Sequence, residues 1–137
     1  MKKSTLIFII VIILVAVGLY GLKQLAKNAG PAYKLAQELK ASGLQIETIK
    51  VTQADQMLEE VMATGGGISI KINHYGNGLF MEKITENLEK EKKDRKKITG
   101  GPPVYIAGNF SVVVFSEPEK GMVKKALTDK FGYVQEY

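Results

Sequence analysis

The feature that most constrains this chain is an uncharged, apolar run close to its N-terminus. Ser4 to Leu22 carry no charge, and the run lies between Lys2–Lys3 on one side and Lys23 on the other. As a helix rising ~1.5 Å per residue, it is roughly 28 Å long, close to the ~30 Å hydrocarbon core of a bilayer. Its apolar residues occupy every side of such a helix, whereas the helices of soluble domains are apolar on one side only. The run predicts a single-pass transmembrane helix.

The charges beside this run predict its orientation. Lys2 and Lys3 favour a cytoplasmic N-terminus, whereas Lys23 and Lys27 favour the opposite orientation. Because a short tail ahead of a first apolar segment usually stays in the cytoplasm, we expect the rest of the chain outside it. A cleaved secretory signal is the alternative, but the apolar run exceeds the roughly 7–15 residues of such signals. We therefore expect residues 1–28 to form a cytoplasmic tip and an uncleaved signal anchor in the cell membrane. Residues 29–137 are expected to form an extracytoplasmic domain at the cell envelope.

The residues after the anchor predict a small α+β domain. Gly30 and Pro31 mark a break, because Pro suits the first turn of a new helix. Hydrophobic periodicity predicts helices over residues 31–42, 52–63, 79–97 and 117–131, with Phe80, Ile84 and Leu88 as the core stripe of the third. Strands are expected over residues 44–51, 68–73, 104–107, 110–116 and, as a short edge, 133–137. The order α-β-α-β-α-β-β-α-(β) predicts a mixed α/β sandwich with helices on one face of the sheet.

The composition excludes several kinds of chemistry. The chain has no cysteine and one histidine, His74, so it has no disulfide framework, no cysteine-ligated metal and no cysteine nucleophile. A zinc-type site needs several converging ligands, and no second His or Cys can join His74. No Gly-x-Ser-x-Gly sequence presents a nucleophilic serine. We expect no catalytic residue, no metal and no cofactor, and therefore no enzyme.

Two glycine-rich segments are candidates for ligand binding. Gly65–Gly67 precedes a strand, whereas phosphate-binding loops lead into a helix, so these glycines are expected to form a flexible connector. His74, Tyr75 and Asn77 lie at a strand end and an adjoining turn, where they could form the rim of a small-molecule site. This rim, together with Gly65–Gly67, carries the alternative function, a membrane-tethered domain that binds or senses a small molecule.

The most distinctive polar feature is a charged run over residues 89–97, with six basic and three acidic residues. Pairs such as Glu89–Lys93 support a helix by about 0.2–0.5 kcal/mol each. The candidate interaction residues are Lys90, Lys92, Lys93, Arg95, Lys96 and Lys97. Acidic residues dilute this charge and no aromatic residue lies within the run, so nucleic acid is not the expected partner.

Together these features predict a membrane-anchored, non-enzymatic interaction or accessory domain of a membrane or envelope complex. An anchored domain has a raised effective concentration near its neighbours in the same membrane. The expected partners are membrane lipid, contacted by residues 4–22, and another membrane or envelope protein. The sequence alone leaves the biological process, the identity of the partner and the oligomeric state open.

Overall fold

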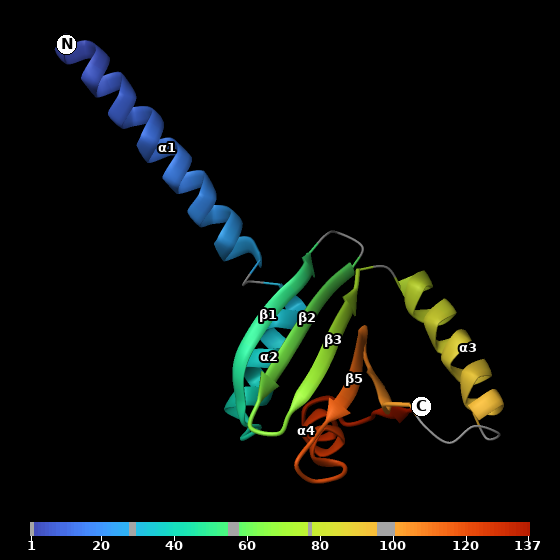
Figure 1. Cartoon of the computed structure of the whole chain (residues 1–137). Helices are drawn as coiled ribbons and strands as arrows, with labels where there is room; N and C mark the ends of the chain where they lie inside the picture. The colour runs from blue at the N-terminus through green and yellow to red at the C-terminus, as the bar shows by residue number, and fades with distance from the viewer. Residues whose placement is uncertain (1, 28–29, 55–57, 77, 96–100) are drawn as a thin grey trace.

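The computed structural model describes residues 2–27, 30–54, 58–76, 78–95 and 101–137, with the backbone alone for residues 20–27, 78 and 95. Four helices lie in these ranges: α1 (Lys3–Lys27), α2 (Pro31–Ala41), α3 (Gly78–Arg95) and α4 (Met122–Phe131). The six strands are β1 (Ile46–Ala54), β2 (Leu58–Gly65), β3 (Ser69–Tyr75), β4 (Val104–Ala107), β5 (Phe110–Ser116) and β6 (Gln135–Glu136). Figure 1 shows α1 extending away from the sheet and the other elements gathered around it.

The strands form one sheet in the order β1-β2-β3-β5-β4-β6, and every neighbouring pair is antiparallel. Alternation along the strands gives the sheet one strongly apolar face. Val61 of β2 lies opposite Ile72 of β3, which lies opposite Val112 of β5. These three side chains are fully buried. The apolar face therefore continues across the three central strands.

Helices α2 and α4 cover this apolar face and complete the core. In α2, buried Ala32, Leu35, Ala36 and Leu39 follow the helical spacing of three and four residues. In α4, Val123 and Leu127 occupy the same kind of stripe and are fully buried. An ion pair between Lys130 of α4 and Glu38 of α2 also links the two helices.

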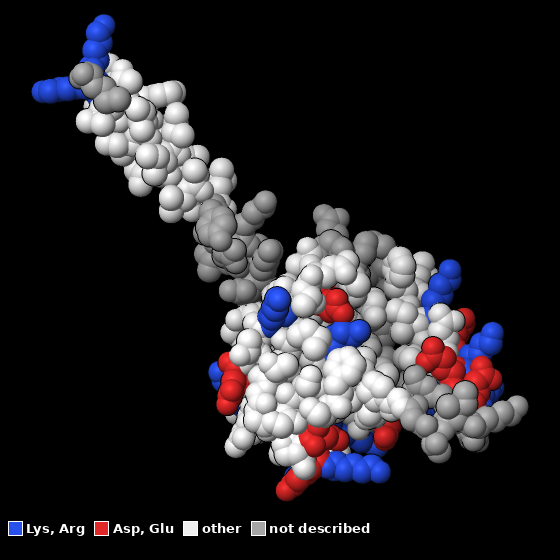
Figure 2. Space-filling view, in the orientation of Figure 1, with Lys and Arg blue, Asp and Glu red and all other residues white. Residues whose placement is uncertain are grey.

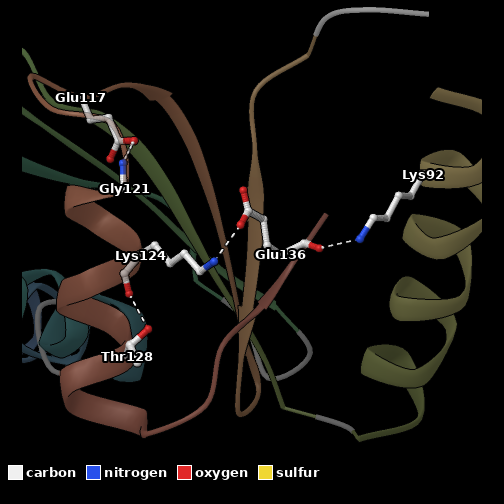
Figure 3. Close-up of polar contacts among 6 residues, drawn as sticks. All are labelled: Lys92, Glu117, Gly121, Lys124, Thr128 and Glu136. Atoms are coloured by element: carbon white, nitrogen blue, oxygen red, sulfur yellow. Dashed lines mark hydrogen bonds and ion pairs between the residues drawn. The ribbon is translucent and has the colours of Figure 1, made fainter. Parts of the chain in front are cut away.

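Helix α3 lies against the opposite face of the sheet. Its Met81 lines a surface hollow together with Ile106 of β4. Ile106 lies opposite Ser111, and Ser111 lies opposite Asn73. This row belongs to the face that points away from the core. Helices therefore lie on both faces of the sheet, and Figure 3 shows α4 and α3 on either side of it.

The first correction concerns residues 52–63, which were expected to form a helix. Residues 58–65 instead form strand β2, and the sheet is antiparallel throughout, not mixed. Leu58, Val61 and Met62 have helical spacing, but the inward side of the strand carries Glu59, Val61 and Ala63. The inward-facing, charged Glu59 interrupts the apolar alternation that would have indicated a strand.

The second correction concerns the predicted membrane anchor. Within the described part of the chain, no helix combines the length and apolar character that a bilayer crossing needs. This finding contradicts the predicted single-pass anchor and the cell-membrane, extracytoplasmic placement that depended on it. The domain boundary predicted after residue 28 lies outside the described residues.

Candidate functional site

His74 lies near the end of β3, in a row of side chains that crosses the sheet on its core face. It is directly opposite Glu59 of β2 on one side and Phe110 of β5 on the other. The His74 and Phe110 ring centroids are 4.9 Å apart, with the ring planes inclined by 50°. Phe110 in turn contacts Phe131 of α4, at 5.7 Å between centroids. The histidine side chain is thus part of an aromatic cluster.

The other two residues of the expected ligand rim are placed differently. Tyr75 follows His74 directly on the strand, so their side chains point to opposite faces of the sheet. Burial raises the pKa of the Tyr75 hydroxyl above 10.0, and the charge of Glu60 raises it further. Asn77 lies outside the described residues. Strand alternation therefore separates His74 from Tyr75, and the ligand rim stays a prediction.

Glu59, which the sequence did not single out, occupies a special position beside His74. Its side chain is buried, and its carboxylate accepts a hydrogen bond from the backbone N–H of Ala32 in the first turn of α2. A helix N-terminus has unpaired N–H groups and a partial positive charge, so a carboxylate is stabilising there. A Cβ on Gly30 would overlap this carboxylate. Gly30 therefore makes the room that the carboxylate of Glu59 occupies.

A second glutamate, Glu117, caps the N-terminus of α4 in the same way. Glu117 accepts hydrogen bonds from the backbone N–H groups of Gly121, at 2.8 Å, and Val123, at 3.1 Å, as Figure 3 shows in part. Gly121, the residue before the helix, has a φ of 85°, a conformation that favours glycine. Both helices that cover the core face therefore begin on a carboxylate. Glu117 could be found from the sequence, because it precedes the helix that it caps by only a few residues.

The basic candidate residues are distributed along the last turns of α3. Lys90, Lys92 and Lys93 are exposed, Arg95 is described by its backbone alone, and Lys96 and Lys97 lie outside the described residues. Lys92 contacts the C-terminal strand: its Nζ donates a hydrogen bond to the Glu136 carbonyl, at 3.3 Å, and lies 5.8 Å from the Tyr137 ring centroid. Figure 2 shows acidic and basic side chains intermixed around α3. A role for this cluster in partner binding stays a prediction.

Glu136 joins the C-terminal strand to helices on both faces of the sheet. Its carboxylate pairs with Lys124 of α4, at 2.9 Å, while its carbonyl accepts from Lys92 of α3, as Figure 3 shows. Next to it, Gln135 Nε2 donates to the Glu89 carboxylate of α3, at 3.4 Å. The short strand β6 therefore lies between α4 and α3 and makes polar contacts with both.

No group of three or more His, Asp or Glu side chains in the described ranges is placed to hold a metal ion. One surface hollow, of about 390 Å³, lies between α3 and the β4–β5 turn. Its lining combines the apolar Met81 and Ile106 with the acidic Glu82 and Glu86. Another, of about 440 Å³, lies along the first turns of α3 beside Leu79 and Phe80. These hollows lie on α3, away from Gly65–Gly67.

The largest uncovered apolar surface among the described side chains belongs to α1. Its described side chains, up to Leu19, are exposed on all sides, and Figure 2 shows an uncharged surface between its basic tip and the undescribed end. The large exposed side chains are Leu6, Ile7, Phe8, Ile9, Ile10, Val11, Ile12, Ile13, Leu14, Val15, Val17 and Leu19. Their exposed fractions run from 38% at Ile9 to 66% at Phe8 and Leu14.

Comparisons with protein-family models, with curated proteins and with solved structures find no match to this chain. The residues and their geometry are therefore the basis for a functional proposal.

Proposed function

We propose that this protein is a non-enzymatic interaction domain that binds a partner protein through the apolar surface of α1. The observation that supports the proposal is the exposure of the twelve large apolar side chains between Leu6 and Leu19. Monomeric soluble proteins rarely expose a contiguous apolar patch above a few hundred Å². Covering such a surface yields about 25 cal/mol for each Å² removed from water, so a fitting apolar partner surface gains affinity from every residue it covers.

The shape of this surface supports a partner with more than one contact point. The apolar side chains occupy all sides of α1, so one helix packed along it covers only part of the surface. A groove or a bundle of helices surrounds more of it. Binding through α1 then places the rest of the domain, whose core is filled beneath α2 and α4, next to the partner.

The non-enzymatic part of the proposal rests on the sequence. A single histidine and the absence of cysteine leave few side chains for nucleophilic or metal-dependent catalysis. In the fold, the ring of His74 packs against Phe110.

The test uses the full chain and two variants. The double variant Ile9→Lys/Ile13→Lys places two charges on one side of α1, and Leu79→Lys changes a more exposed apolar residue of α3 as the control. Each protein is expressed in its source cells, isolated with its bound proteins, and the copies of each per chain are quantified. We expect a stoichiometric partner with the unchanged chain and with Leu79→Lys, and its loss with Ile9→Lys/Ile13→Lys.

Two outcomes would overturn the proposal. One is recovery of the unchanged chain as a monomer without a stoichiometric protein. The other is quantitative association of the purified chain with phospholipid vesicles, abolished by Ile9→Lys/Ile13→Lys, with no protein bound. In that case the apolar surface serves the lipid contact predicted for residues 4–22, and the proposed protein interaction is wrong.

A further inference from the structure

Helix α3 is attached to the domain differently from α2 and α4. It is the longest of the three, with 18 residues against 11 and 10. However, Met81 is the only buried side chain among those described in α3, whereas α2 buries four and α4 buries two. The continuous hydrophobic core contains residues of α2, α4 and the sheet, and no described residue of α3. Apolar burial therefore holds α3 much less firmly than it holds the other two helices.

Polar, solvent-exposed contacts join the C-terminal half of α3 to the C-terminal strand. They include the hydrogen bond from Lys92 to the Glu136 carbonyl, the hydrogen bond from Gln135 to Glu89, and the position of Lys92 over the Tyr137 ring. Exposed pairs of this kind contribute little each, because water and salt compete with them. The attachment of this half of α3 to β6 can therefore break at a small cost.

The sheet face beneath α3 suits contact with water. Its buried polar residues are Asn73 of β3 and Ser111 of β5, which lie opposite each other. On the core face, the neighbouring positions are Ile72 and Val112. Water can satisfy the amide and the hydroxyl when α3 leaves, so exposing this row costs less than exposing the core face.

Glycines flank α3 in the sequence. Gly76 precedes it, Gly78 is its first residue, and Gly101, with a φ of 123°, begins the next described range of the chain. Residues of this kind absorb the backbone rotation at a hinge with little steric cost.

We propose that α3 is a hinged cover, which leaves the sheet as one unit while α2, α4 and the sheet stay folded, and so uncovers the row of Asn73, Ser111 and Ile106. Local opening of this kind occurs where few apolar contacts are buried and the hydrogen bonds are exposed to solvent. The proposal stands on α3 and β6, and it is independent of any binding by α1.

The chain has no cysteine, so one introduced thiol reports the opening directly. Ser111→Cys places a thiol under α3 with almost no change in volume. Val112→Cys is the matched control, since this neighbour is fully buried on the core face, beneath α2 and α4. The full-length proteins are treated with a thiol reagent under native conditions and the labelling is followed by mass spectrometry. We expect labelling at position 111 to be at least about tenfold faster than at position 112.

A second change tests the contact with β6. Lys92→Met keeps the alkyl stem and removes the charge, and Lys90→Met makes the same change at an exposed neighbour. In the Ser111→Cys background, Lys92→Met should accelerate labelling about two- to fivefold, and Lys90→Met should leave it unchanged. Neither change should affect labelling at position 112.

Hydrogen exchange of the unchanged chain keeps the proposal testable if a cysteine variant fails to fold. The amides of residues 79–95 should exchange faster than those of α2 and α4. Lys92→Met should accelerate exchange in residues 79–95 and leave exchange in α2 and α4 unchanged. Equal labelling rates at positions 111 and 112, or equal protection of α3 and α2, would show that α3 is released only by global unfolding. Either result would overturn the proposal.

Discussion

Glu59 of β2 accepts a hydrogen bond from the backbone N–H of Ala32, at the start of a helix that precedes it by 27 residues. The contact joins a buried carboxylate to the positive end of α2. Glu117 makes the equivalent contacts with α4. The two helices that cover the core are therefore each fixed at their N-terminal end by a carboxylate from outside the helix.

Substitutions at Glu59 should measure the strength of this contact. Glu59→Gln keeps an acceptor oxygen but loses the charge, and should lower the free energy of unfolding by about 1 kcal/mol. Glu59→Ala leaves the N–H of Ala32 unpaired and should cost about 2–3 kcal/mol. Urea denaturation followed by circular dichroism measures both values. Glu60→Gln, on the other face of the same strand, is the control and should change the free energy by less than about 1 kcal/mol.

Gly30 should be coupled energetically to Glu59. Gly30 has a φ of −66°, which alanine adopts without strain, so Gly30→Ala acts only through the overlap of its Cβ with the Glu59 carboxylate. We expect Gly30→Ala to destabilise the protein about as much as Glu59→Ala. In the double variant the overlap is absent, so the double variant should lose much less stability than the sum of the losses of the two single variants. Additive losses would show that the two residues act separately.

The sequence predicts most of this fold, and its failures have physical causes. The strand over residues 68–73 and the hairpin over residues 104–116 follow their alternation and turn residues closely. β2 was not predicted because its inward-facing Glu59 interrupts the apolar alternation. Glu59 faces inward because it accepts a hydrogen bond from the first turn of α2, and this contact exists only after folding. In α3, Phe80 was expected in the core but is 43% exposed, and its neighbour Met81 is buried instead. Periodicity predicts that a helix has an apolar stripe. It does not predict which side of the helix contacts the sheet when that face of the sheet also carries polar residues.

Gly65 should tolerate no side chain, although the sequence suggested a flexible connector there. It belongs to β2, and a Cβ on it would overlap the Gln45 carbonyl and lie 2.8 Å from the Glu47 nitrogen. Both atoms belong to the backbone of the neighbouring segment, residues 45–47, which cannot move aside as a side chain can. Gly65→Ala should therefore lower the free energy of unfolding by about 1–3 kcal/mol. Gly66→Ala is the matched control: its Cβ would meet the Gln45 side-chain oxygen, which can move aside. Thermal denaturation should separate the two variants clearly, and equal melting temperatures would contradict the packing described for Gly65.

Alkaline pH should destabilise the protein through its tyrosines. Burial raises the pKa of Tyr75, Tyr105 and Tyr137 above 10.0, and nearby glutamates raise each further. Below pH 10 these groups are protonated in both states, and their contribution to stability is complete. Above pH 10 the unfolded chain loses protons that the folded chain retains, so the free energy of unfolding falls as pH rises towards the folded-state values.

A substitution at Tyr137 allows part of the stability loss at alkaline pH to be assigned to one residue. Its hydroxyl is buried, which is the main cause of its raised pKa, and the charge of Glu89 raises this pKa further. Tyr137→Phe keeps the ring beneath Lys92 and removes the ionisable group. We expect a free energy of unfolding at neutral pH that is equal or slightly higher, and a smaller loss between pH 10 and 11. Urea denaturation across this range measures both, and an unchanged slope would mean that Tyr137 ionises equally easily in the folded and unfolded chain.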